Sequence, residues 1–107
     1  MSTITIENEI IEFIAKVTPE KCYIGITNNI GRRFVEHGII EKDTSKPRDS
    51  RIVWLHRNAG SESNARSIEK VFLDRLPGKI CNGFCRERKP TYVYVYTPIL
   101  GVTNENI

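Results

Sequence analysis

The chain has no apolar run long enough to cross a bilayer, because polar residues interrupt every hydrophobic segment. It also has no secretory-type start, since residues 1–17 carry three glutamates where such a signal needs a basic start and an unbroken apolar stretch. Cysteine is scarce, and its odd count of three argues against a closed disulfide framework. These absences predict a cytoplasmic protein without a membrane partner, whose Cys22, Cys81 and Cys85 are free thiols.

A strong charge of one sign is also missing. The net charge is +3, which by itself indicates no nucleic-acid partner. The distribution is more informative, because basic residues gather in three separated segments. Brought together on one surface, these segments would bind a polyanion, whereas scattered segments would be ordinary solvated surface. Their members are Arg32 and Arg33, then Arg51 and Arg57, then Arg86, Arg88 and Lys89.

The apolar pattern predicts one α+β domain over residues 1–107, a length that can bury a modest core. Residues 9–17 fit a strand, with a short helix as the alternative. Thr27 or Asn28 is the expected N-cap of the first helix, and Gly38 its end. The order β-β-α-β-α-β predicts a small mixed or antiparallel sheet flanked by helices, with a hairpin of the first two strands. The expected strands are 9–17, 22–27, 51–57 and 91–99, and the expected helices are 28–38 and 61–78.

The second expected helix carries a carboxylate on its apolar side. At about 100° per residue, Glu69 falls on the side of the helix that Ile68 and Phe72 should turn toward the sheet. An unpaired carboxylate in such a place costs several kcal/mol, so a metal ion or an arginine is expected beside it. Glu69 is therefore a candidate metal ligand.

The first expected helix places two polar residues on its core side. Arg33 and His37 are spaced i, i+4, so they can act on a common group. Two interpretations are open. Either Arg33 forms an ion pair with Glu69 while His37 is a hydrogen-bonded half-buried residue, or the three residues form a functional site.

The stretch CYIGITNNIGRRFVEHG, residues 22–38, closely resembles the second half of the GIY-YIG nuclease module. Tyr23, Ile24 and Gly25 match the YIG triplet, and a double arginine and a histidine follow as they do in the family. The resemblance therefore implies the α+β fold of that family.

A second segment, NARSIEKVFLDRL, resembles the later helix of the family, whose glutamate binds a single divalent metal ion. That glutamate corresponds to Glu69, and Asn82 falls near a downstream asparagine of the family. The resemblance as a whole covers residues 10–82.

The resemblance implies an endonuclease that hydrolyses DNA phosphodiester bonds with Mg²⁺ or Mn²⁺. Tyr23 would activate water, while Arg33 would clamp the scissile phosphate. His37 would position or shuttle a proton, and Glu69 would hold the metal. DNA is expected as substrate before RNA, for a monomer or homodimer of phage or mobile-element type, with a partner protein as a further source of specificity. The expected nucleic-acid contacts are Gly25, Thr27, Arg32, Arg57, Asn82, Arg86 and Arg88.

The first triplet of the family has no match. Its tyrosine should stand on the strand before Tyr23, where this sequence has Glu12 and Phe13. Phe13 keeps the aromatic ring and lacks the hydroxyl. Either Tyr23 and His37 suffice for cleavage, or the chain is a nucleic-acid-binding or interaction module without efficient cleavage.

Two further patterns have weaker interpretations. Cys81 and Cys85 could belong to a zinc site, although structural zinc usually repeats a tighter two-residue spacing. Tyr92, Tyr94 and Tyr96 alternate along the last expected strand, where they would either stack on bases or join the core.

Overall fold

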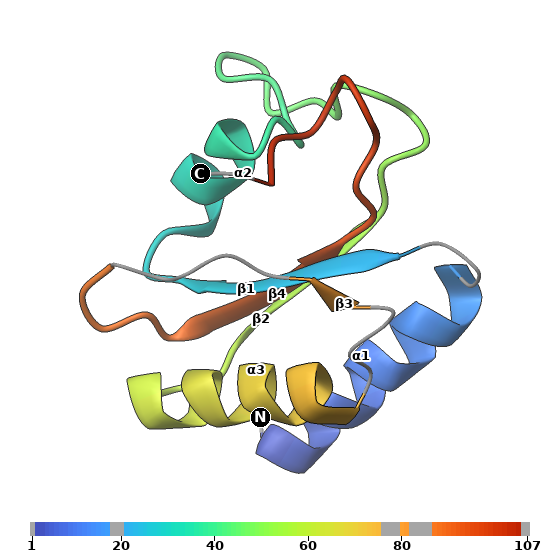
Figure 1. The fold of residues 1–107 in the computed structure, drawn as a ribbon. Helices are drawn as coiled ribbons and strands as arrows, with labels where there is room; N and C mark the ends of the chain where they lie inside the picture. Colours follow the sequence, from blue (N-terminus) through green and yellow to red (C-terminus); the bar gives the residue numbers. More distant parts are fainter. Residues whose placement is uncertain (1, 18–20, 76–79, 82–86, 106–107) are drawn as a thin grey trace.

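A sheet with helices on both faces forms the fold, in a computed structural model that describes residues 2–17, 21–75, 80–81 and 87–105 (Figure 1). In chain order the elements are α1 (Thr3–Val17), β1 (Cys22–Thr27), α2 (Ile30–Glu36), β2 (Trp54–Asn58), α3 (Glu62–Arg75), β3 (Ile80–Cys81) and β4 (Tyr92–Tyr96). The sheet order is β2-β4-β1-β3. The central strand β4 runs antiparallel to β1 and β2, and the short β3 is parallel to β1.

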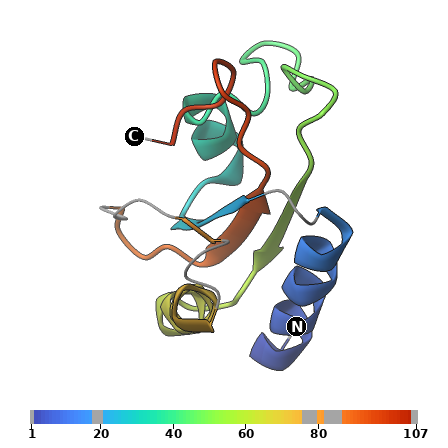
Figure 2. The ribbon, with the colours of Figure 1, turned by 45° about the vertical axis from the view of Figure 1, so that its right-hand side comes forward.

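The two faces of the sheet have different partners. Helix α2 and the C-terminal segment cover one face, and α1 and α3 cover the other (Figures 1 and 2). Alternation along β1 separates the faces, because Tyr23 packs with the α2 side whereas Ile24 and Ile26 pack with the α1 and α3 side. A small α+β architecture is thus confirmed.

The expected strand at 9–17 is wrong, because these residues belong to helix α1. Ile6, Ile10 and Ile14 recur every fourth residue and are all buried, as one face of a helix requires. The Ser2 hydroxyl accepts a hydrogen bond from the Thr5 amide at 3.1 Å, so the first turn is capped. The run in which a strand was expected is too short and too apolar to show a helical period by itself. Ile6, which reveals the four-residue spacing, lies before that run.

The expected hairpin of the first two strands is therefore wrong as well. The antiparallel neighbour of β1 is β4, from the other end of the chain, which pairs with β1 from Tyr23 opposite Tyr96 to Thr27 opposite Tyr92. Strand pairing between distant segments leaves no mark in local periodicity, so the sequence pattern could not supply this neighbour.

The remaining expected elements are confirmed with small shifts. The N-cap of α2 is Asn29, one residue after the two candidates, and its side chain accepts from the Arg32 amide at 3.0 Å. Gly38 follows the end of α2 with φ of +75°, a conformation that favours glycine. No helix in the described residues is long and apolar enough to cross a membrane.

One close approach fixes β4 against β1. Tyr94 lies directly opposite Gly25, and its ring lies over the glycine. A Cβ atom at Gly25 would overlap Cζ and Oη of Tyr94 and would stand 2.9 Å from Cε1. Because the Tyr94 ring also packs against Phe34, with ring centroids 5.7 Å apart, it has little freedom to withdraw.

Substitution of Gly25 by alanine should lower the free energy of unfolding by about 1–3 kcal/mol, because the added methyl group overpacks the contact with Tyr94. The matched control is Gly31→Ala within α2, where the nearest atom to an added Cβ is Asn29 Oδ1 at 3.7 Å. That control should raise stability by up to about 1 kcal/mol through helix propensity. Urea denaturation measures both, and an unchanged midpoint for Gly25→Ala would contradict the packing.

Candidate functional site

Tyr23 and Gly25 of the YIG triplet face α2, whereas Ile24 packs with the α1 and α3 side. Tyr23, Gly25 and Thr27 alternate on the same side of β1, and Tyr23 and Thr27 are 2% and 0% exposed. The Tyr23 ring lies 4.7 Å from the His37 ring, edge to face, and stacks with Tyr96 at 5.2 Å. The triplet thus contributes to an aromatic cluster beneath α2.

Helix α2 places Arg33 and His37 over this cluster. The Nε of Arg33 donates to the Tyr94 hydroxyl at 3.4 Å, and the Nε2 of His37 lies 2.7 Å from the same oxygen. Arg33 and His37 therefore contact a common group, the Tyr94 hydroxyl. His37 is fully buried, so it can reach a substrate only through another residue.

The hydrogen-bond partners of His37 define its tautomer. The Nδ1 atom lies 2.7 Å from the Asn104 carbonyl oxygen, which can only accept, so Nδ1 carries the proton. The Nε2 atom must then accept from the Tyr94 hydroxyl. The Tyr96 hydroxyl lies 3.0 Å from Nδ1 and donates to a Glu105 carboxylate oxygen at 2.8 Å. The C-terminal segment thus holds the imidazole in the orientation that accepts the Tyr94 proton.

Burial keeps both partners of this hydrogen bond neutral. It lowers the pKa of His37 below the ordinary 6.5, and the nearby Arg33 guanidinium lowers it further, against the hydrogen bond to Asn104. Burial likewise raises the pKa of Tyr94 well above its ordinary value, and the hydrogen bond from Arg33 offsets only part of that effect. At neutral pH the pair is a neutral imidazole accepting from a neutral phenol.

A carboxylate that the sequence analysis did not consider lies beside the arginines. Glu87, just before β4, accepts from the Thr27 hydroxyl at 2.7 Å and the Asn28 amide at 3.1 Å, and it pairs with Arg32. One of its oxygens lies 3.8 Å from the Nε of Arg33. The available signal in the sequence was a single acidic residue within the basic run RERK.

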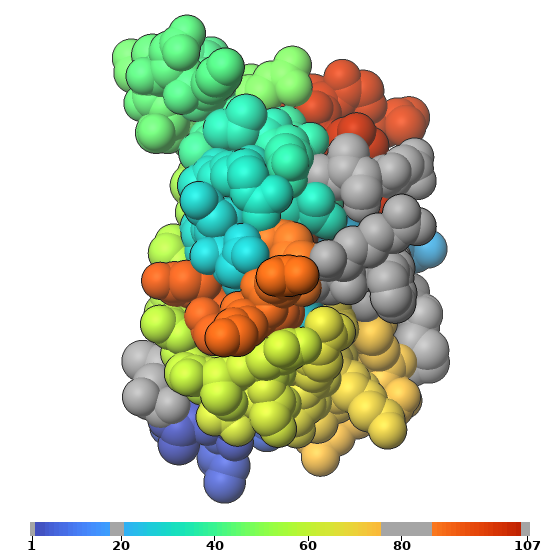
Figure 3. Space-filling view, turned by 90° about the vertical axis from the view of Figure 1, so that its left-hand side faces the viewer, coloured from blue at the N-terminus to red at the C-terminus, as the bar shows by residue number. Residues whose placement is uncertain are grey.

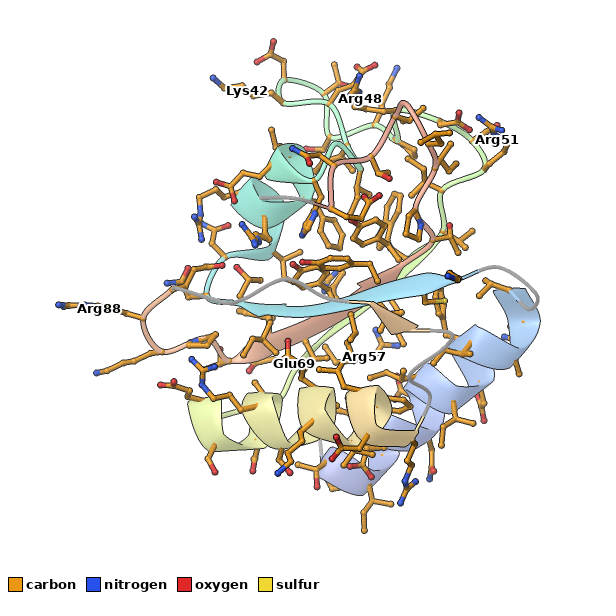
Figure 4. The ribbon with its side chains drawn as sticks, in the orientation of Figure 1. Lys42, Arg48, Arg51, Arg57, Glu69 and Arg88 are labelled. Atoms are coloured by element: carbon orange, nitrogen blue, oxygen red, sulfur yellow. The ribbon has the colours of Figure 1, made fainter. Side chains whose placement is uncertain are left out.

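Glu69 lies in a different layer. It is half-buried on α3, which covers the opposite face of the sheet, and its carboxylate is directed toward the sheet (Figure 4). Among the described residues no group of three or more His, Cys, Asp and Glu side chains could hold a metal ion. Its carboxylate does suit Mg²⁺ or Mn²⁺, which prefer oxygen ligands and commonly keep water and phosphate for the others.

The three basic segments come together only in part. The side-chain amide of Asn28 donates to the Arg88 carbonyl at 3.0 Å, so the segment of Arg88 joins that of Arg32. Arg57 instead pairs with Glu9 of α1, and Arg51 pairs with Asp49 far from Arg88 (Figure 4). Asn82, Arg86, Cys85 and the side chain of Cys81 lie outside the described residues, and Cys22 is a buried free thiol.

The expected place of the first tyrosine is wrong. Phe13 belongs to α1 and packs against the core on the α1 and α3 side, away from Tyr23. The tyrosine opposite the glycine of the YIG triplet is Tyr94, whose hydroxyl lies over Gly25. Tyr94 and Tyr96 thus join the core, whereas Tyr92 is half-buried.

Comparisons of the chain with models of protein families, with characterised proteins and with solved structures found no match. The geometry of the candidate site is therefore the basis for its chemistry. It brings together Tyr23, Arg33 and His37 from the expected set, adds Tyr94 and Glu87, and leaves Glu69, on the opposite face of the sheet, and Arg57 elsewhere.

His37 should titrate below its ordinary pKa of 6.5, because burial and Arg33 disfavour the imidazolium. The unfolded chain then takes up a proton before the folded chain does. The free energy of unfolding should therefore fall as the pH drops below about 6.5, by at most about 1.4 kcal/mol per pH unit for one proton. NMR titration of the imidazole resonances measures the pKa, and denaturation from pH 7 to 5 measures the stability.

The second histidine supplies the control. His56 is exposed at the surface of β2, and its pKa is also lowered by partial burial and by Arg57. Most of the slope should disappear in His37→Gln and remain in His56→Gln. An imidazole of His37 that titrates at or above 6.5 would contradict the assigned hydrogen bonds.

Proposed function

We propose that the chain is an endonuclease of the GIY-YIG type, which hydrolyses DNA phosphodiester bonds with Mg²⁺ or Mn²⁺. One observation carries the proposal. The Tyr94 hydroxyl lies over Gly25, the glycine of the YIG triplet, within hydrogen-bond distance of Arg33 and His37. A tyrosine therefore stands on the strand that pairs with the YIG strand, which is where the family resemblance requires one.

In this proposal the order of the strands along the chain is permuted. The family places its first triplet before the YIG strand, whereas here the pairing strand is β4, near the C-terminus of the chain. Because a sheet is held by pairing and not by chain order, the same pair of tyrosines can be assembled from either end. Phe13 then has no role in the reaction.

The arrangement provides the parts that phosphodiester hydrolysis needs. The Arg33 guanidinium would hold non-bridging phosphate oxygens and stabilise their developing charge. The Tyr94 hydroxyl would take a proton from the attacking water and pass its own to Nε2 of His37, which is unprotonated and aligned at 2.7 Å. His37 is in this account a positioning residue, and Tyr23 supplies a second phenol beside it.

The metal requirement rests on Glu69. By the resemblance, Glu69 would hold the ion, whose chemistry is charge neutralisation at the phosphate and help for the leaving oxygen. Because Glu69 lies on α3, on the face of the sheet opposite to Arg33 and Tyr94, the metal requirement rests on the resemblance and not on the arrangement of Arg33 and Tyr94.

Burial of the two phenols supports a second candidate, a nucleic-acid-binding module without cleavage. Tyr23 and Tyr94 are 2% and 1% exposed, so a phosphate would meet Arg33, whose side chain is 13% exposed, before it meets either hydroxyl. The two candidates agree on DNA as the partner, on a cytoplasmic monomer or homodimer, and on the arginines as contacts. They differ in whether Tyr94 takes part in chemistry.

Substitution of Tyr94 by phenylalanine should lower the rate of metal-dependent plasmid nicking by about 10²–10⁴-fold, because the proton path to His37 is lost while the ring remains. Tyr92→Phe is the matched control on the same face of β4, and it should leave the rate nearly unchanged. Phe13→Tyr should also change nothing. Nicking must disappear in Glu69→Gln to count as the activity of this chain.

These variants separate the candidates. Equal nicking by Tyr94→Phe and Tyr92→Phe would exclude the proposed role of the hydroxyl. Binding of DNA without nicking in the unsubstituted protein, with either metal, would favour the binding module.

Arg33 and Arg32 allow a test of the phosphate clamp. Arg33→Lys keeps the charge and loses the planar fork, so nicking should fall about 100-fold while DNA affinity changes little. Arg32→Lys keeps the charge at the more exposed arginine, whose side chain is 44% exposed against 13% for Arg33, and should lower the rate much less than Arg33→Lys. Single-turnover rates and fluorescence anisotropy give the two quantities. A parallel loss of binding and rate in both variants would make α2 a basic docking surface only.

A further inference from the structure

Glu87 occupies a set of anion-binding groups that lies beside Tyr94. We call this set the anion seat: the Thr27 hydroxyl, the Asn28 amide, and the guanidinium groups of Arg32 and Arg33. Three of these donors converge on one oxygen, Oε1 of Glu87. The Arg33 group lies 3.8 Å from the other oxygen, Oε2.

The donors of the seat are held in place by other contacts. The Thr27 hydroxyl accepts from the Asn29 amide at 3.1 Å and donates to Glu87 at 2.7 Å, with the Asn29 carbonyl oxygen as a more distant second acceptor at 3.3 Å. The Asn28 side chain donates to the Arg88 carbonyl at 3.0 Å and accepts from Arg32 at 3.1 Å. A preorganised seat of this kind binds an oxyanion without much loss of side-chain entropy.

The chemistry of the seat fits a phosphate group as well as a carboxylate. A non-bridging phosphate oxygen carries the negative charge and the acceptor capacity that Oε1 shows here. The two arginines contact different oxygens of the Glu87 carboxylate, and they can contact the two non-bridging oxygens of a phosphodiester in the same way. Arg33 also contacts the Tyr94 hydroxyl, so an anion in the seat would lie near the proposed reactive group.

We propose that Glu87 is a built-in competitor for this seat, which a backbone phosphate of the nucleic acid must displace. The proposal rests on the proposed function for the identity of the ligand. The Glu87 side chain is only 13% exposed, and its segment lies against the start of α2 and over α3 (Figure 3). In this arrangement the carboxylate neutralises the arginines until a phosphate replaces it.

A supporting role and a competing role for Glu87 predict opposite effects of its neutralisation on anion binding. If the carboxylate serves to orient Arg32 and Arg33 for the phosphate, its neutralisation should weaken binding of an anion. If it competes, neutralisation should strengthen binding. The sign of one substitution, Glu87→Gln, therefore separates the two roles.

The chain contains a matched control for net charge. Glu36 also pairs with both arginines, at 3.7 Å from Arg32 and 3.2 Å from Arg33, but its side chain is 38% exposed against 13% for Glu87. Glu36→Gln removes the same unit of charge without emptying the seat. Any effect common to both variants is long-range electrostatics, which salt should screen.

The experiment is a titration of each protein with inorganic phosphate and with a short DNA duplex at fixed ionic strength. Shifts of the Asn28 amide and the Arg33 Nε–H resonances report binding at the seat. Glu87→Gln should bind both ligands at least about tenfold more tightly than the unsubstituted protein, which is the gain expected when a competing charge-assisted contact is removed. Glu36→Gln should gain less than about threefold, as an exposed ion pair does.

Unchanged or weaker binding by Glu87→Gln, or an equal gain in both variants, would overturn the proposal. A second measurement needs no variant: phosphate bound to the unsubstituted protein should shift the side-chain carboxyl carbon of Glu87 as it leaves the seat. Phosphate that shifts the Asn28 amide while the Glu87 carboxyl carbon stays unchanged would also overturn it. Neither readout depends on cleavage. If Glu87→Gln binds phosphate more tightly in a protein that never nicks DNA, the endonuclease proposal is refuted and the competitor role of Glu87 is supported.

Discussion

The contact between Gly25 and Tyr94 is the constraint on which the rest of the site depends. Because Gly25 has no Cβ atom, the Tyr94 ring can lie over β1, and its hydroxyl then reaches both His37 and Arg33. Any larger residue at position 25 would move the ring and break both hydrogen bonds. The tautomer of His37, set by Asn104, and the low polarity of the cluster then decide that the phenol is the donor.

Local pattern predicted the parts of this structure that are made locally. The strand at 22–27, the helices after it, and the inward side of α2 follow from β-propensity, caps and helical periodicity. The neighbour of β1 does not, because pairing with β4 joins residues about seventy positions apart, as Gly25 and Tyr94 are. The wrong strand at α1 hid this pairing as well, because it gave β1 a neighbour in the place that β4 occupies.

The partners of the site were predictable to a similar degree. Arg33 and His37 were identified from the sequence because polar residues on the apolar face of a helix are costly to bury without a partner. The sequence pattern left two places open for Tyr94, stacking on bases or packing in the core, and its register with Gly25 puts its hydroxyl at the site. Glu87 was masked by its basic neighbours in the sequence, and in the folded chain its carboxylate, not those neighbours, contacts the arginines. Charge clusters read along a sequence thus say little about which charge faces the site.

The most direct measurement is a crystal structure of the protein with a short DNA duplex and Ca²⁺, which occupies Mg²⁺ sites and commonly suppresses cleavage. The account predicts a backbone phosphate within about 3 Å of the Arg33 guanidinium and close to the Tyr94 hydroxyl, the distance of a charge-assisted hydrogen bond. It also predicts Glu87 displaced from Thr27 and Asn28. A duplex bound elsewhere, with Glu87 still on both arginines and no phosphate near Tyr94, would contradict it.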